Sequence, residues 1–288
     1  MTNEPIRDEP SLFDALYEDE NAVVRALRAG ARAEASDEEG TTALYLAAVQ
    51  DLPGTVRLLL AAGADPDRAS GPETGDLPLC GAACGGHTEV VEALLAAGAR
   101  PDLREEFGFT ALRWAAGLGH AATVEALLAG GADPLLPGPQ GEPMLVLAAQ
   151  RGSVRTVRAL LEYGAGARGQ EAVVGVALAE ARRLAGVDLE RELLGQLEEA
   201  YGTGLDAVVR REVVDGEETV AVELLRDGEP AAGVDRHTGH AEVAVLLGEV
   251  MRGGAAGPAG GATGPAGGAT GPAGGATGPA GAPPTRLG

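Results

Sequence analysis

A repeat of about 33 residues is the feature that most constrains this chain. Gly-Ala pairs recur at residues 30–31, 63–64, 98–99, 131–132 and 164–165, at spacings of 33, 35, 33 and 33. Ala-Ala and Leu-Leu pairs follow the same steps, beginning at Ala47, Ala82, Ala115 and Ala148 and at Leu59, Leu94, Leu127 and Leu160. Such a period is typical of solenoids, because one unit is too small to bury its apolar face and must stack on its neighbours.

The residue types within one unit, residues 108–134, predict two short helices. Thr110 stands before an apolar run, where its hydroxyl can cap free backbone amides. Gly119-His120 interrupts that run, and the apolar residues of Ala121–Ala129 then share one face of a second helix. Gly131 ends this helix, since glycine adopts the left-handed conformation without strain. Each unit is therefore expected to be a helix–turn–helix.

Three short motifs connect these units to a known family. The unit openings are residues 40–45, 75–80, 108–113 and 141–146, the Gly-His steps are 86–87 and 119–120, and the Ala-Asp-Pro endings are 64–66 and 132–134. This pattern resembles the ankyrin repeat, which opens on Gly-x-Thr-Pro-Leu-His-x-Ala-Ala, over about residues 11–164. The family's histidine after leucine is replaced by Tyr45, Cys80, Arg113 and Val146, so its hydrogen bond to the turn is lost or made differently.

The resemblance implies an all-α ankyrin-repeat solenoid of stacked helix–turn–helix units. We expect an N-terminal capping repeat at 11–39 and four repeats at 40–74, 75–107, 108–140 and 141–166. Residues 167–252 are expected to hold diverged C-terminal helices. Within them, we predict that Gln170–Tyr201 forms a fifth helix pair, with Leu193-Leu194 continuing the Leu-Leu series.

The end of the chain departs from the period. Residues 208–225 are rich in valine around Asp215-Gly216, which predicts a small β-hairpin. Residues 239–252 echo the pattern of 86–95 and predict a closing helix, so the hairpin would be an insertion in the last unit that protects the end of the stack. Residues 253–288 repeat Gly-Pro-Ala-Gly-Gly-Ala-Thr and, with little to bury, are expected to be a disordered low-complexity tail.

Composition excludes several classes of function. The net charge of −21 opposes binding to nucleic acid or to anionic membranes, which requires basic side chains. We find no signal-peptide pattern, no apolar stretch of membrane-spanning length and only two cysteines, which indicates a cytoplasmic protein without a disulfide framework. The abundance of alanine, glycine and proline indicates GC-rich coding, and a bacterial type of ankyrin-repeat protein is expected.

No residue pattern points to catalysis, a cofactor or a metal. Cys80, Cys84 and His87 have a spacing that could supply three zinc ligands, but both cysteines occupy repeat positions and no fourth ligand is evident. The other histidines follow glycine in predicted turns, as in the family, except His237, which is isolated. The serines lack a nucleophile elbow. We therefore predict a non-enzymatic protein with no catalytic, cofactor-binding or metal-binding residues.

A partner-binding surface is the remaining candidate site. The resemblance implies that partners bind the turn tips and the exposed face of the first helices, and the third unit adds aromatic residues and an apolar strip. The predicted residues are Glu39, Thr41, Asp76, Phe107, Phe109, Trp114, Leu118, Leu135, Gln140, Glu142, Gln150 and Arg151. Aromatic anchors often dominate binding energies. Trp114 also fits a packing role between repeats, whereas Phe107 and Phe109 occupy tips, which are poorly placed for a core.

Two functions follow from these observations. The leading hypothesis is a monomeric, non-enzymatic ankyrin-type protein that binds a protein partner on its concave face, with acidic residues that favour a basic partner. A narrower version is an inhibitor or immunity protein that blocks a cationic site. The alternative is that 167–252 is a small catalytic or ligand-binding module with the repeats as its targeting arm. A deep pocket with convergent polar groups would favour it.

Overall fold

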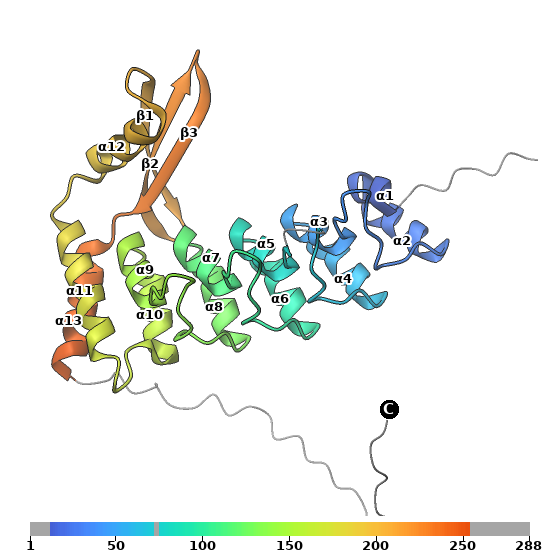
Figure 1. Ribbon diagram of the computed structural model, residues 1–288, viewed down its shortest axis with the longest axis horizontal. Helices are drawn as coiled ribbons and strands as arrows, with labels where there is room; N and C mark the ends of the chain where they lie inside the picture. Colours follow the sequence, from blue (N-terminus) through green and yellow to red (C-terminus); the bar gives the residue numbers. More distant parts are fainter. Residues whose placement is uncertain (1–11, 72–74, 254–288) are drawn as a thin grey trace, which may run out of the picture. The chain divides into compact units, whose positions relative to one another are not determined.

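The computed structural model describes residues 12–71 and 75–253 (Figure 1). Five helix pairs follow one another in this part of the chain. They are α1 (Leu12–Glu18) and α2 (Glu20–Arg28), α3 (Ala43–Val49) and α4 (Pro53–Ala61), α5 (Pro78–Gly85) and α6 (Thr88–Ala96), α7 (Ala111–Leu118) and α8 (Ala121–Ala129), and α9 (Met144–Arg151) and α10 (Val154–Leu160). Apart from Gly253, the predicted tail lies outside the described residues.

Local sequence explains where the helices of the third pair begin and end. The Thr110 hydroxyl accepts a hydrogen bond from the Arg113 N–H (3.2 Å), which caps α7 as predicted. Gly119 ends the helix in the left-handed region, with φ 85°. Ala115 and Ala116 are fully buried between the helices. Their small side chains permit the close contact of α7 with α5 and with α9.

One hydrophobic core runs through the stacked pairs. The first helices contact one another in the order α3, α5, α7, α9, and the second helices in the order α4, α6, α8, α10. Leu59, Leu94, Leu127 and Leu160 are each fully buried at equivalent positions. Burial of a leucine side chain stabilises a fold by about 1.5–3 kcal/mol. Each repeat therefore gains a similar contribution to the folding free energy from its buried leucine.

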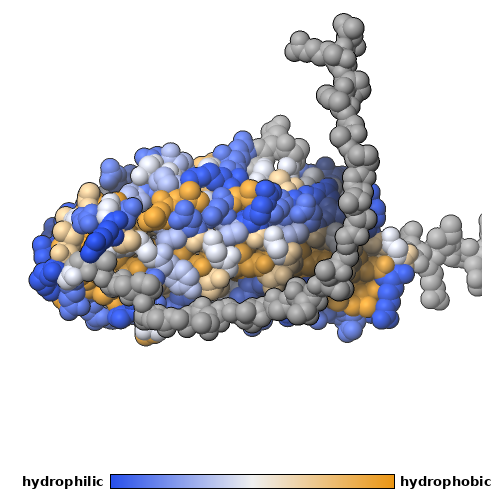
Figure 2. Space-filling model, turned by 90° about the horizontal axis from the view of Figure 1, so that it is seen from below, coloured by the Kyte–Doolittle hydropathy of each residue, from blue (hydrophilic) through white to orange (hydrophobic). Residues whose placement is uncertain are grey.

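The lower side of Figure 1 carries α4, α6, α8, α10 and the turns that follow them. Figure 2 views this side and shows a band of hydrophobic residues between hydrophilic margins. Exposed alanines add apolar surface at the helix ends, namely Ala61, Ala62, Ala96, Ala97 and Ala129. Among the described helices, none combines the length and the hydropathy that a bilayer span requires.

The fold is mostly helical rather than all-α, because three antiparallel strands follow the helices. Strands β1 (Asp206–Val214), β2 (Glu217–Arg226) and β3 (Glu229–His237) form a sheet in the order β1-β2-β3. Asp215-Gly216 makes the predicted turn, with φ 54° and 83°. The predicted hairpin near 208–225 is therefore present, as strands β1 and β2 of a larger sheet. Asp227-Gly228, with φ 55° and 85°, makes a second turn of the same kind and adds β3.

The prediction that Gln170–Tyr201 forms a fifth helix pair holds for its two helices but is wrong about their pairing. Helix α11 (Glu171–Ala185) packs against α9 and α13 (His240–Gly253), whereas α12 (Leu189–Tyr201) packs against β2 and β3. Leu193 lies in a separate small core with residues of β2, and Leu247 of α13 is buried in the core of the stack instead. The insertion between α11 and α13 thus comprises α12 and the whole sheet.

Candidate partner-binding surface

Two of the predicted aromatic residues are held in a cluster. The rings of Phe109 and Trp114 meet edge to face, with centroids 5.0 Å apart and an interplanar angle of 87°. The Arg113 guanidinium lies 4.5 Å from the centre of the Phe109 ring. The Trp114 indole N–H donates to Glu105 Oε1 (2.7 Å). Both rings are half-buried, so this cluster supports the neighbouring tip more than it offers free anchors.

The Glu105 carboxyl group at the centre of this cluster is buried. Burial raises its pKa, and the nearby charge of Asp76 raises it further, while the hydrogen bond from Trp114 opposes both effects. Arg113 is engaged on the other side, where its Nε–H donates to Glu142 Oε1 (3.2 Å). Charged groups in this unit therefore have internal partners, which fixes the conformation of the residues leading into α7.

The adjacent tips present two exposed apolar side chains, Phe107 (64% exposed) and Leu135 (48% exposed). The Arg104 guanidinium ties the tips together, since it donates to the carbonyl of Gly108 (2.6 Å) and to that of Pro137 (2.7 Å). Beside Leu135 lies a small pocket of about 90 Å³, lined mainly by apolar residues that include Pro134, Pro137, Pro143 and Met144. We call Phe107, Leu135 and this pocket the tip surface.

Polar residues on the other predicted tip positions divide into two groups. Glu39 and Gln140 are exposed, whereas Thr41, Asp76 and Glu142 are half-buried. The half-buried ones shape the turns, as where Glu142 Oε2 accepts a hydrogen bond from the Gln140 N–H (2.9 Å). Acidic side chains therefore border the tip surface without covering its apolar part.

Three predicted residues lie at the far ends of the first helices, away from the tips. Leu118 (37% exposed) and Gln150 remain accessible. The prediction that Arg151 contacts a partner is corrected by the structure, because its side chain is only 12% exposed. Its guanidinium is bound by the carboxylate and carbonyl of Asp235 in β3. Arg151 therefore attaches the sheet to the stack.

Sequence reasoning missed how the β1–β2 turn caps two helices of the stack. Asp215 Oδ2 accepts a hydrogen bond from Ala122 N–H (3.2 Å) at the start of α8. Glu217 accepts from Arg155 N–H (3.0 Å) and from the Ser153 hydroxyl (2.5 Å) at the start of α10. Carboxylates at helix N-termini satisfy free amides and stabilise the helix dipole. Only the acidic residues around the turn hinted at this in the sequence.

The histidines brace neighbouring helices. A ring Nε2 hydrogen-bonds a carbonyl of an earlier first helix in three pairs, namely His87 with Val49 (3.0 Å), His120 with Cys84 (3.0 Å) and His240 with Gln150 (3.1 Å). His237 is not isolated as its sequence position suggested. Its Nε2–H donates to the Gly119 carbonyl (3.2 Å), and its Nδ1 accepts from the Thr219 hydroxyl (3.0 Å). The turn of the next unit, Gly152-Ser153, has serine where the earlier turns have histidine, so His237 supplies a histidine contact to this part of the stack from β3.

Cys80 and Cys84 do not gather a metal site in the described structure. Burial raises the pKa of both thiols, strongly for Cys80, which disfavours the thiolate that zinc requires. The His87 ring is directed to the Val49 carbonyl. Within residues 12–71 and 75–253, no cluster of three or more histidine, cysteine, aspartate or glutamate side chains is placed to hold an ion.

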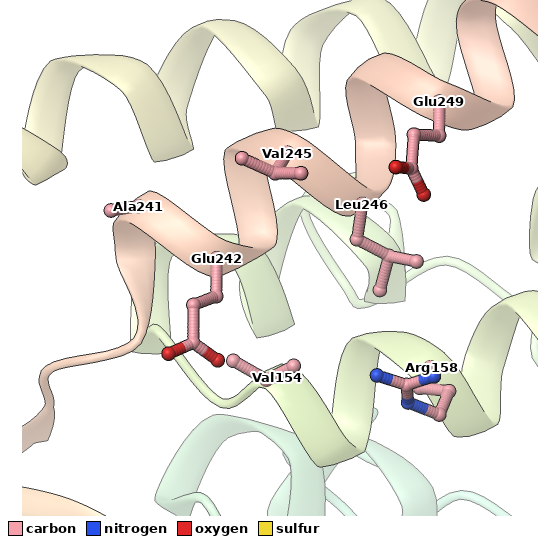
Figure 3. A pocket seen from close by; sticks show the side chains of 7 residues that line it. All are labelled: Val154, Arg158, Ala241, Glu242, Val245, Leu246 and Glu249. Atoms are coloured by element: carbon pink, nitrogen blue, oxygen red, sulfur yellow. The ribbon is translucent and has the colours of Figure 1, made fainter.

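A groove of about 360 Å³ lies between α10 and α13. Figure 3 shows Leu246 and Glu242 of α13 pointing towards α10, where Val154 and Arg158 face them. Its lining is mixed, with apolar side chains such as Val154 and Leu246 beside the charged Glu249. The chain enters α13 from strand β3, whereas each second helix of the repeats follows its own first helix directly. The groove lies where this path differs from that of the repeats.

A second cleft, of about 250 Å³, lies where the insertion leaves and rejoins the stack. Polar residues line it, including Asp188, Glu190, Arg211, Thr238 and His240. Each is already engaged: Asp188 caps α12, Arg211 pairs with Glu190, Thr238 bonds Glu218, and His240 bonds the Gln150 carbonyl. The polar groups of this cleft therefore serve to fasten α12, the sheet and α13 together.

Comparison with known proteins agrees with the repeat structure. A family model described as ankyrin repeats (3 copies) matches residues 54–137 and 79–171. A search of curated proteins finds no match to the chain. The matched residues run from α4 to the start of α11 and include the two Gly-His turns and the fully buried alanine pairs that begin at Ala82, Ala115 and Ala148. Residues 54–171 of this chain therefore consist of ankyrin repeats.

Proposed function

We propose that this chain is a non-enzymatic protein that binds a protein partner through its tip surface. Ankyrin repeats are generally protein–protein interaction modules, which supports the class of function. The observation that carries the site is the exposure of Phe107 on a tip held by the Arg104 hydrogen bonds. A large apolar side chain on an already ordered support loses little conformational entropy on binding.

The partner that fits this surface is basic. The chain has a net charge of −21, and acidic residues border the tips, whereas Arg104 and Arg113 are engaged internally. Opposite charges around an apolar centre accelerate encounter and discriminate against acidic competitors. An inhibitor or immunity protein that covers a cationic site on its target is the narrower form of this proposal.

Alanine substitutions at the tip surface test the proposal. Phe107→Ala and Leu135→Ala should each weaken binding by about 2 kcal/mol, roughly thirtyfold, as expected for anchor residues. Tyr17→Ala is the matched control, because Tyr17 is equally exposed but lies on α1. Pull-downs with the wild type and these three variants identify the proteins lost only with the tip variants, and calorimetry then measures each affinity.

Two outcomes would contradict this assignment. A change within about 0.5 kcal/mol for both tip variants means that neither residue is an anchor. An equal loss for Tyr17→Ala means that the effect is not specific to the tips. The alternative, a ligand-binding module in residues 167–252, rests on the cleft beside His240, whose polar groups already have internal partners. Binding to the tips is therefore the better supported function.

A further inference from the structure

Strand β1 is an uncovered edge of the sheet. It pairs with β2 on one side, and α12 packs mainly against β2 and β3, with Glu190 of α12 reaching Arg211 of β1. Nearly all of its residues are exposed, including Val213 (72%) and Val209 (43%). A nine-residue edge with free backbone groups and exposed valines is a template for another strand.

The opposite edge of the sheet is protected, and β1 is not. Strand β3 carries Pro230, which has no N–H to donate, and its pairing with β2 is interrupted by a bulge at Leu224–Leu225. Proline and bulges are devices by which proteins block edge pairing. Strand β1 pairs with β2 in continuous register from Asp206 to Val214 and contains no proline. The difference indicates that β1 is kept open for pairing.

Charged residues often protect an edge, but those of β1 are largely neutralised within the chain. Arg210 pairs with Glu223 (3.0 Å), and Arg211 pairs with Glu190 (2.7 Å) and with Glu218 (3.3 Å). Among the described residues, no hydrogen bond or ion pair engages the Glu212 side chain. Near the centre of β1, Arg210 and Arg211 thus have partners, whereas Glu212 is available to an arginine of a second strand.

We propose that β1 pairs antiparallel with β1 of a second copy of this chain, centred on Arg211. This register places Arg210 opposite Glu212 of the second copy, and symmetry forms the same ion pair twice. It also places Val209 opposite Val213 and Val208 opposite Val214, so the exposed valines cover each other. Opposite charges and β-branched side chains that lie directly across from each other on neighbouring strands stabilise a sheet.

The register is specific, because other alignments lose these pairs. Centring on Arg210 instead places Val209 opposite Arg211 and Val208 opposite Glu212. Such a slip sets charges against apolar side chains. In the proposed register Arg211 lies opposite Arg211 of the second copy. The repulsion between the two guanidinium groups is offset because each already pairs with Glu190 and Glu218 of its own chain. The product is a continuous six-stranded sheet, and the two tip surfaces of the dimer allow bivalent binding.

Charge reversal tests the pairing in the full chain. Sedimentation velocity over a dilution series should show a dimer for the wild type. Glu212→Arg should weaken association about tenfold, because it sets two arginines against each other twice. The double variant Arg210→Glu with Glu212→Arg should recover part of that loss. Glu229→Arg, on the protected edge, is the matched control and should leave association unchanged, while circular dichroism confirms that each variant is folded.

Cysteine pairing tests the register. With Cys84→Ser to remove the exposed thiol, Arg211→Cys places two cysteines opposite each other and should yield a disulfide-linked dimer on mild oxidation. Arg210→Cys should not, because that position faces residue 212. A monomer at every concentration overturns the proposal. So does a dimer that Glu212→Arg leaves intact, or one that cross-links equally well from positions 210 and 211.

Discussion

The ankyrin repeats and the C-terminal insertion bury their apolar residues in different ways. In the repeats, every inner helix has a neighbour on both sides, and fully buried residues such as Leu94 and Leu127 belong to one continuous core. In the insertion, α12 covers one face of a three-stranded sheet, and the fully or nearly buried residues are few, among them Leu193 and Val222. The repeats are stable by stacking, whereas the insertion depends on polar contacts that fasten it to the stack.

Core truncations should separate the two regions most clearly. Leu127→Ala leaves a cavity in the continuous core and should lower the free energy of unfolding of the whole stack by about 2–5 kcal/mol. Leu193→Ala should instead open the insertion while the stack remains folded. Urea unfolding with hydrogen exchange read out by mass spectrometry distinguishes these results. If Leu193→Ala accelerates exchange in α5 and α6 as much as in α12, the two cores are not independent.

Substituting Gly119, which lies where the stack meets the sheet, should lower stability by a smaller amount. Gly119 has φ 85°, and a Cβ there would collide with the His237 ring and the Arg151 guanidinium, so Gly119→Ala should cost roughly 1–3 kcal/mol and loosen the sheet. Gly131→Ala is the control, because Gly131 has φ 94° but open space around it. The stability loss of Gly131→Ala should therefore reflect backbone strain alone. Thermal melts compare them, and equal losses would mean that contact with His237 contributes nothing.

Acid should weaken the histidine contacts and should give the smallest loss of stability among these predictions. Burial lowers the pKa of His120, His237 and His240 below the ordinary value of 6.5. Below about pH 6.5 the unfolded chain therefore binds more protons than the folded one, and stability falls as pH falls towards the folded-state pKa values. Urea titrations between pH 8 and pH 5 should show this fall, and His237→Gln should reduce its slope. An unchanged slope would exclude His237 from the effect.

The sequence allowed the repeats to be predicted because their signals are local and recur. The Thr110 cap, the Gly119 stop and the buried alanine pairs each act within one unit or on its immediate neighbour. Leu193-Leu194 misled because its spacing from the earlier pair fits the period, although Leu193 packs against β2. The second turn, Asp227-Gly228, carried the same signal as the first and was available to prediction.

The candidate site was only partly accessible to sequence reasoning. The exposure of Phe107 follows from its place on a tip, which the repeat pattern locates. The role of Arg151 depends on Asp235, which is 84 residues away, and the capping of α8 by Asp215 spans 93 residues. No local pattern encodes such distances. Long-range polar contacts therefore account for most of what sequence reasoning could not supply.

The cleft beside His240 also shows that the two ends of the insertion meet. Val187 and Asp188, where the chain departs, and Thr238 and Ala241, where it returns, line the same small space. A segment whose entry and exit points adjoin can be exchanged without altering the path of the helices on either side. The sheet and α12 thus form a cassette, and a short linker joining α11 to α13 would convert this protein into a plain row of repeats with a conventional final pair.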